Sequence, residues 1–269
     1  MRIRPARTGD CVGGPPDGVV SGAGQPDGVG YAPFVDTLSP ADASLPANVL
    51  AGPATNAAFA QYCEAIFELE EDEVDVIQAR IAERLGVSRP AVSEMVRRLE
   101  TERLVRSDGR IRLTNAGREL AESVVRRHRL AERMLTDILG LSWSEAHLEA
   151  SSWEKVISPA VEIAINRLLG GPTTCPHGNP IPGSDYHPPE TVQLSDVGPG
   201  RRFVVTRIPE ELEFTPGLLE FLESASVTPG SQGSVTTRSP DGTVTVEIDG
   251  TFVGIGTFAS ARILVGLRD

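Results

Sequence analysis

Apolar side chains recur every three or four residues from about position 57, the spacing of the buried face of an α-helix. The pattern predicts two helices, and Gly86 ends the second. Ser88 is a candidate N-cap for a third helix, with Pro90 in the first turn, where its missing N–H does no harm. The apolar positions of the first two helices are Tyr62, Ile66, Leu69, Ile77, Ile81 and Leu85.

Two short runs of alternating arginine and aliphatic residues follow the third predicted helix. The runs are 104–106 and 110–113, and a Ser-Asp-Gly turn at 107–109 joins them, so we expect a β-hairpin. A helix, a glycine turn, a short helix and a hairpin, in this order, are typical of a winged helix-turn-helix, although two short helices with a hairpin also occur in modules that bind only other proteins.

Basic residues are concentrated in the same region. The net charge of −12 argues by itself against nucleic acid, but residues 80–128 contain 12 arginines against 7 acidic residues. A basic stretch in an acidic chain indicates a surface for a polyanion, or else a solvated Arg/Glu helix surface. Because it coincides with the winged helix, we expect binding to double-stranded DNA. The hairpin arginines expected to reach phosphates are Arg106, Arg110 and Arg112.

The rest of the chain predicts a helical part and a β part. Two amphipathic helices from Gly117 to about Leu169, with a break near Gly140, are followed by short alternating strands and one helix over 217–224. The predicted fold class is mainly α with a small β-barrel. The predicted segments are a disordered Pro/Gly-rich tail at 1–57, a winged helix-turn-helix at 58–118, a helical domain at 119–183, a linker at 184–200 and a β-domain at 201–269.

Composition argues against other classes of protein. No stretch approaches the roughly 18 apolar residues of a membrane helix, so we expect no membrane association. The arginines near the start precede no apolar segment of a signal peptide, and the three cysteines are scattered. These features predict a cytoplasmic protein.

His128 and Glu132 are four residues apart on one predicted helix, so their side chains converge on one face. His147 lies in the following helix and could approach them. Two imidazoles and a carboxylate suit a divalent ion such as Fe²⁺, Mn²⁺, Zn²⁺ or Co²⁺. The same pair also occurs on helix surfaces without a metal. Further oxygen donors in the β-domain are Glu210, Glu211 and Glu213.

Several sequence blocks within residues 57–269 resemble the diphtheria toxin repressor family of metal-activated bacterial transcription regulators. The blocks include ARIAERLGVSRPAVSEMVRRLETERLV, ILGLSWSEAHLEASSWEKV and CPHGNPIPG, in that order. The resemblance implies a winged helix, a helical dimerisation and metal domain and a C-terminal SH3-like (FeoA-like) domain. It also implies a homodimer that binds a palindromic operator with Fe²⁺ or Mn²⁺ bound and represses metal-homeostasis genes, with Zn²⁺ or Co²⁺ as possible substitutes in vitro.

The resemblance further implies an ancillary metal site. In the family this site uses a His and a Glu four residues apart, a second His about nineteen residues after the first, and a pair from the SH3-like domain. His128, Glu132 and His147 match the first three positions, and Glu210 with Glu213 is the closest match to the pair.

The primary, activating site of the family is degenerate in this chain. Its positions hold Gln61, Ser151, Glu154 and Lys155, and only Glu154 is a usual ligand. Lys155, whose ammonium repels a divalent ion, is hypothesised to replace the metal, pairing with Glu154 and Gln61 to hold the first helix in place. The alternative is that Lys155 points into solvent and the site has been lost.

The recognition helix also departs from the family pattern, because Glu94 stands where Gln is usual. A carboxylate can accept from a cytosine amino group but cannot approach a phosphate, so we expect a different or weaker operator. The residues of this helix expected to contact DNA are Ser88, Arg89, Pro90, Ser93, Glu94 and Arg97.

Other interpretations stay open. Cys175 and His177 could be ligands, but their segment resembles a turn of the family, so a structural role is favoured. A family member could bind its operator without sensing metal. The two histidines and the carboxylate could also support non-haem iron catalysis, but no substrate-pocket motif, nucleophile or phosphate loop accompanies them, so we expect no enzyme.

Overall fold

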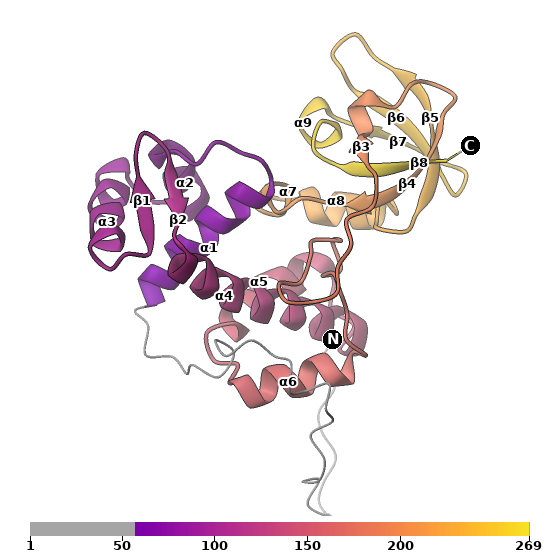
Figure 1. Ribbon diagram of the computed structural model, residues 1–269. Helices are drawn as coiled ribbons and strands as arrows, with labels where there is room; N and C mark the ends of the chain where they lie inside the picture. The colour runs from indigo at the N-terminus through magenta and orange to yellow at the C-terminus, as the bar shows by residue number, and fades with distance from the viewer. Residues whose placement is uncertain (1–56, 269) are drawn as a thin grey trace, which may run out of the picture. The chain divides into compact units, whose positions relative to one another are not determined.

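The computed structural model describes residues 57–268, and the predicted tail, apart from Ala57, lies outside them. The first domain forms as predicted, with Gly86 in the left-handed conformation after α2 and Ser88 Oγ accepting from the Ala91 N–H at 3.3 Å. Its apolar faces share one core. Its elements are α1 (Ala57–Glu71), α2 (Gln78–Leu85), α3 (Arg89–Thr101) and the antiparallel hairpin of β1 (Val105–Ser107) and β2 (Ile111–Leu113) (Figure 1).

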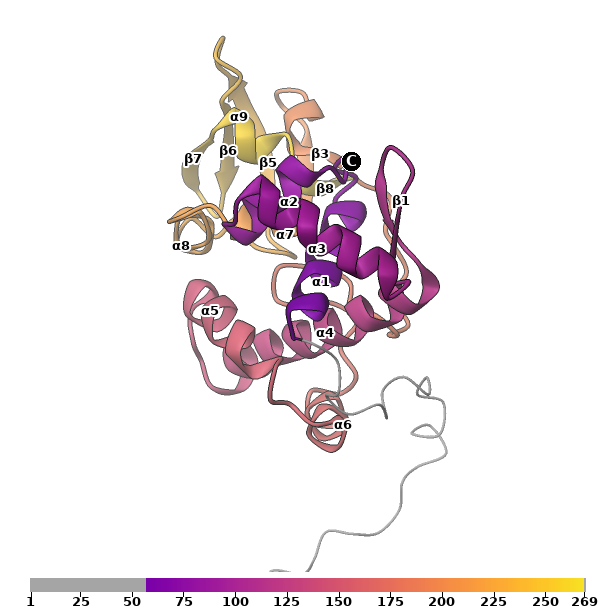
Figure 2. The ribbon, with the colours of Figure 1, turned by 90° about the vertical axis from the view of Figure 1, so that its left-hand side faces the viewer.

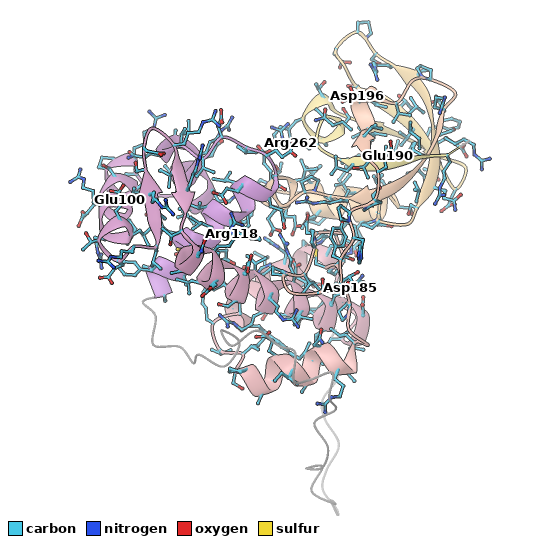
Figure 3. All side chains as sticks on the ribbon, in the orientation of Figure 1. Glu100, Arg118, Asp185, Glu190, Asp196 and Arg262 are labelled. Carbon is cyan, nitrogen blue, oxygen red and sulfur yellow. The ribbon has the colours of Figure 1, made fainter. Side chains whose placement is uncertain are left out.

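The second domain is helical and has one helix more than the sequence predicted. α4 packs against α1, as both views show (Figures 1 and 2), and Arg118 on α4 (labelled in Figure 3) forms an ion pair with Glu70 of α1 beside that contact. The additional helix begins after Ser158, whose hydroxyl caps it, with proline in its first turn. The helices are α4 (Asn115–Arg133), a π-helical turn (Met134–Ile138), α5 (Trp143–Trp153) and α6 (Pro159–Leu168).

The third domain is an open antiparallel sheet within the described residues. Its strand order is β3-β8-β4-β5-β6-β7, with β3 and β7 as edges, so the closed barrel that the sequence predicted is not seen. The strands are β3 (Val192–Gln193), β4 (Arg202–Arg207), β5 (Gln232–Arg238), β6 (Val244–Ile248), β7 (Thr251–Ile255) and β8 (Leu264–Arg268). Three short helices accompany them, α7 (Glu210–Glu213), α8 (Leu218–Ser224) and α9 (Thr257–Ser260).

The segment expected as a linker is partly structured. β3 lies within 184–200, and Val192 pairs with Val265 of β8. A two-residue strand such as β3 is too short to show a periodic pattern in the sequence. None of the helices among residues 57–268 is both long and apolar enough to cross a membrane.

Candidate metal centre

Three imidazoles surround one carboxylate oxygen of Glu132. Glu132 Oε1 lies 3.2 Å from His128 Nε2, 3.1 Å from His147 Nδ1 and 3.7 Å from His177 Nδ1. The helical spacing of α4 puts His128 one turn before Glu132, and α5 brings His147 from the neighbouring helix. All four side chains are buried.

Glu213 of α7 closes the cluster from the third domain. Its Oε2 lies 3.0 Å from both His147 Nδ1 and His177 Nδ1, yet it makes no hydrogen bond of acceptable geometry within the described residues. Asn179 holds the other oxygen, since its amide donates to Glu213 Oε1 at 2.8 Å and to the Ile208 carbonyl at 3.0 Å. Such outer contacts orient metal ligands.

A tight loop brings in Cys175 and His177. Gly178 has φ +88°, and a Cβ there would lie 2.3 Å from the Thr206 carbonyl oxygen, so only glycine fits. The loop places Cys175 Sγ 3.8 Å from His177 Nδ1 and within reach of Glu132. The sequence favoured a purely structural role for Cys175 and His177. The expected turn is present, but it also places both donor side chains in the cluster, so that interpretation was incomplete.

The donor set fits a first-row divalent ion. Metal–ligand distances of about 2.0–2.3 Å put tetrahedral ligands roughly 3.3–3.8 Å apart, close to the separations between the Glu132, Glu213 and imidazole atoms. Carboxylate ligands suit manganese, imidazole suits iron and zinc, and a thiolate suits zinc. The Glu213 oxygen, close to two nitrogens but without a hydrogen bond, is a natural ligand position.

The electrostatics show what the ion must displace. Burial alone would lower the pKa of His147, but its hydrogen bond with Glu132 and the negative charges of Glu213 and Glu132 raise it to about 10. The pKa values of His128 and His177 also rise well above their usual range, because neighbouring carboxylates outweigh burial. The carboxylates therefore favour protonated imidazoles, and a bound ion competes with those protons.

Glu210 was also predicted as a metal ligand, but its position favours metal binding less than those of Glu132 and Glu213. It is buried, and its donor atom lies within reach of His128 and His147. Its Oε2, however, is also 3.2 Å from Arg129 Nη2, and an oxygen held by a guanidinium is a weaker donor to a cation.

A second group of donors lies beside the cluster at the degenerate primary positions. Glu154 Oε2 is 2.7 Å from His128 Nδ1, and its Oε1 is 3.8 Å from the ammonium of Lys155. Ser151 donates its hydroxyl proton to the His147 carbonyl, and Gln61 is exposed. Glu64 joins this group with Glu154 and His128.

Glu64 was missed by the sequence analysis. The available signal was helical spacing, since Glu64 follows Gln61 by three residues on one face of α1. Burial, followed by the charge of Glu154, raises the pKa of Glu64 to about 8.

The predicted DNA-contacting residues lie on α3, at its N-cap and on the hairpin. All are exposed except Ser93, which is partly buried and whose hydroxyl accepts from Arg97 Nη2 at 3.2 Å. Arg106 and Arg112 are paired across β1 and β2, and Arg110 lies 3.0 Å from Asp75 at the surface. Their contacts with DNA stay a prediction.

Three family models match consecutive parts of the chain. Residues 56–110 match the N-terminal DNA binding domain of iron dependent repressors, 114–183 their metal binding and dimerisation domain, and 192–266 the FeoA domain. The iron-dependent repressor IdeR of Mycobacterium tuberculosis (strain ATCC 25618 / H37Rv) is 41% identical over 202 residues, covering 70% of this chain and 87% of that protein.

Two further similarities agree with this match. The diphtheria toxin repressor of Corynebacterium diphtheriae (strain ATCC 700971 / NCTC 13129 / Biotype gravis) is 49% identical over 126 residues, which are 46% of this chain and 56% of that protein. The solved structure of a manganese-dependent transcriptional repressor in complex with manganese superposes with a TM-score of 0.71 at 33% identity, covering 78% of this chain and 100% of that one. The chain belongs to the diphtheria toxin repressor family of metal-dependent regulators, whose members are transcriptional repressors and not enzymes.

Proposed function

We propose that this protein is a transcriptional repressor that binds its operator when Fe²⁺ or Mn²⁺ occupies the cluster around Glu132. The observation that carries the proposal is the convergence of Glu132 and Glu213 on three imidazoles, in a chain whose first domain is a DNA-binding domain. Bound there, the ion supplies two positive charges that link elements distant in sequence.

The ligands would come from three parts of the chain. α4 and α5 supply the predicted histidines and Glu132, the loop before the third domain supplies Cys175 and His177, and α7 supplies Glu213. Because affinities follow the Irving–Williams order, Zn²⁺ and Co²⁺ should also bind in vitro. The proposed ligands belong to two overlapping groups of donor atoms that share Glu132, one with His147 and Glu213 and one with Cys175 and His177, and His128 Nε2 lies 3.2 Å from Glu132 Oε1.

We also propose that the protein binds a palindromic operator as a homodimer. Apolar side chains remain exposed on the helical domain, with Leu148 at 72%, Val156 at 79% and Leu168 at 59% of their full accessibility. Exposed large apolar residues on neighbouring helices suit association with a second copy. Two recognition helices related by a two-fold axis read two half-sites.

The proposed domain boundaries are close to those predicted from the sequence. The DNA-binding domain would occupy 58–118, the metal and dimerisation domain 119–183, and the SH3-like domain 192–268 after a short linker. An SH3-like arrangement is compatible with the open six-stranded sheet.

A metal-independent regulator is the second candidate function. It is favoured by Ser151 and Lys155, neither of which can serve the primary position as a strong ligand for a divalent ion.

Operator binding at fixed salt, with chelator and then with Mn²⁺, Fe²⁺ and Zn²⁺ in turn, separates the two candidates. The DNA probe is the region upstream of this gene or of a neighbouring metal transporter. Binding only with metal supports the sensor, provided that Glu132→Gln abolishes it and the surface change Glu149→Gln does not. Equal binding in chelator supports the metal-independent regulator.

A further inference from the structure

A small cavity of about 150 Å³ lies between α1, α2, α4, α5 and α7. Its wall carries more negative than positive side chains. The carboxylates are those of Glu64, Glu68, Glu154 and Glu210, and the permanent cations are those of Arg84 and Lys155.

Most of these charges already have partners. Arg84 lies 3.2 Å from Glu68, and Arg129, from outside the cavity, lies 3.2 Å from Glu210. In contrast, no hydrogen bond or ion pair joins Glu64 to another residue of the described chain. Glu154 is held through Oε2, which lies 2.7 Å from His128 Nδ1, so its Oε1 and the carboxyl group of Glu64 are the acidic groups that face the shared space without a hydrogen bond among the described residues.

Lys155 is the cation positioned to balance both carboxylates. Its Nζ lies 3.8 Å from Glu154 Oε1, and its side chain is 59% exposed, so the flexible stem can move the ammonium along the cavity mouth. Lys155 and Glu64 also line a larger neighbouring cavity of about 380 Å³, so the ammonium can approach Glu64 without entering packed core. An ammonium is a compact charge with rotatable donors and needs no fixed coordination geometry.

We propose that the ammonium of Lys155 serves as a tethered cation in this cavity, where it joins Glu154 to Glu64 of α1 and excludes a second divalent ion. The inference rests on the proposed function, because it assigns the metal response to the cluster around Glu132 alone. The tethered cation would connect the helical domain to the DNA-binding domain although Ser151 and Lys155 stand at positions of the degenerate primary metal site.

Metal stoichiometry tests the proposal directly. The full-length wild type, titrated with Mn²⁺ and followed by the electron paramagnetic resonance signal of free Mn²⁺, should bind one equivalent per chain. Lys155→Met keeps the approximate length of the side chain but removes its charge. This variant should bind a second equivalent of Mn²⁺, with an affinity at least tenfold higher than that of any second equivalent bound by the wild type. Lys155→Arg should behave like the wild type, and Glu64→Gln with Lys155→Met should lose the added equivalent.

Operator affinity provides an independent measurement. With just enough Mn²⁺ for the first equivalent, Lys155→Met should bind operator at least tenfold more weakly than the wild type, and excess Mn²⁺ should restore binding. The proposal is overturned if Lys155→Met binds the same number of Mn²⁺ equivalents as the wild type and binds the operator with the same affinity. A wild type that takes up no Mn²⁺ contradicts the proposed function instead, so the two failures are distinguishable.

Discussion

Arg129 and Glu71 form a partly buried two-point ion pair that joins the metal-binding helix to the DNA-binding domain. Arg129 Nη1 donates to Glu71 Oε1 at 3.0 Å and Nη2 to Oε2 at 2.7 Å, and Arg129 has no exposed surface. Arg129 follows His128 on α4, whereas Glu71 ends α1. A second arginine, Arg207 of β4, contacts Glu71 at 3.0 Å and Asp72 at 2.7 Å.

Replacing Arg129 should destabilise the fold and weaken the link between the domains. Arg129→Met leaves the buried Glu210 without its cation and Glu71 with Arg207 alone, and losing one partner of a buried pair costs about 3–5 kcal/mol. Urea unfolding should show this loss, whereas Arg80→Met, which breaks an exposed pair with Glu83, should change stability by less than about 1 kcal/mol. Equal stabilities for the two variants would contradict the assigned role of Arg129.

Removing the charge of Glu132 should abolish metal binding with little change in shape. Glu132→Gln keeps the volume but removes the carboxylate that faces three imidazoles, so we expect metal affinity to fall at least about 100-fold. Calorimetric titration with Mn²⁺ measures the effect. Glu149→Gln, on the exposed face of α5, should bind as the wild type does.

Metal affinity should weaken as the pH falls below about 10, because the imidazole of His147 then carries a proton that the ion must displace. Each proton released costs about tenfold in affinity per pH unit. Calorimetry in buffers of different ionisation enthalpy counts the protons. A binding enthalpy independent of the buffer would show that the imidazoles are already neutral.

The same pKa shift should act on the stability of the metal-free protein with a definite sign. A histidine whose pKa is raised by folding stabilises the native state fully below its unfolded value of about 6.5, and this contribution disappears as the pH rises through the folded value. The unfolding free energy contributed by His147 should therefore decrease between about 6.5 and about 10. Comparing His147→Gln with the wild type across this range isolates that contribution.

Cys175 should be a thiolate ligand, whereas Cys63 should not react. The Co²⁺ complex should show thiolate-to-metal charge-transfer absorption, which Cys175→Ser should lose and Cys63→Ser should keep. Burial raises the pKa of the Cys63 thiol to about 12, and this cysteine has no exposed surface, so alkylating reagents at pH 8 should not modify it in the native protein. Charge-transfer absorption that persists in Cys175→Ser would remove this residue from the ligand set.

Glu94 and Arg112 should affect DNA binding in different ways. Both are exposed, Glu94 on α3 and Arg112 on β2. Glu94→Gln should change which operator sequences bind, since Glu94 is predicted to read bases. Arg112→Met should weaken binding to all sequences and reduce the slope of log affinity against log salt by about 1. Selection of binding sequences and a salt series measure the two effects.

Local sequence signals determined the helices and the hairpin of the first domain. As predicted, Gly86 ends α2, Ser88 and Pro90 start α3, and a short turn joins β1 to β2, although this turn lies at 108–110, one residue later than expected. These features depend on neighbours within a few residues, so spacing and residue type are sufficient to predict them. The pairing of His128 with Glu132 follows from the period of one helix for the same reason.

Only the tertiary structure decided which side chains meet in the cluster. Cys175 and His177 lie on a loop, Glu213 lies on a short helix of the third domain, and Glu64 lies on the first helix, so no sequence period relates them. β3 likewise becomes a strand only because it pairs with β8, the last strand in the chain. Sequence spacing determines which residues share a helix face, but the distance between elements is set by how their buried faces pack, and metal coordination depends on that distance.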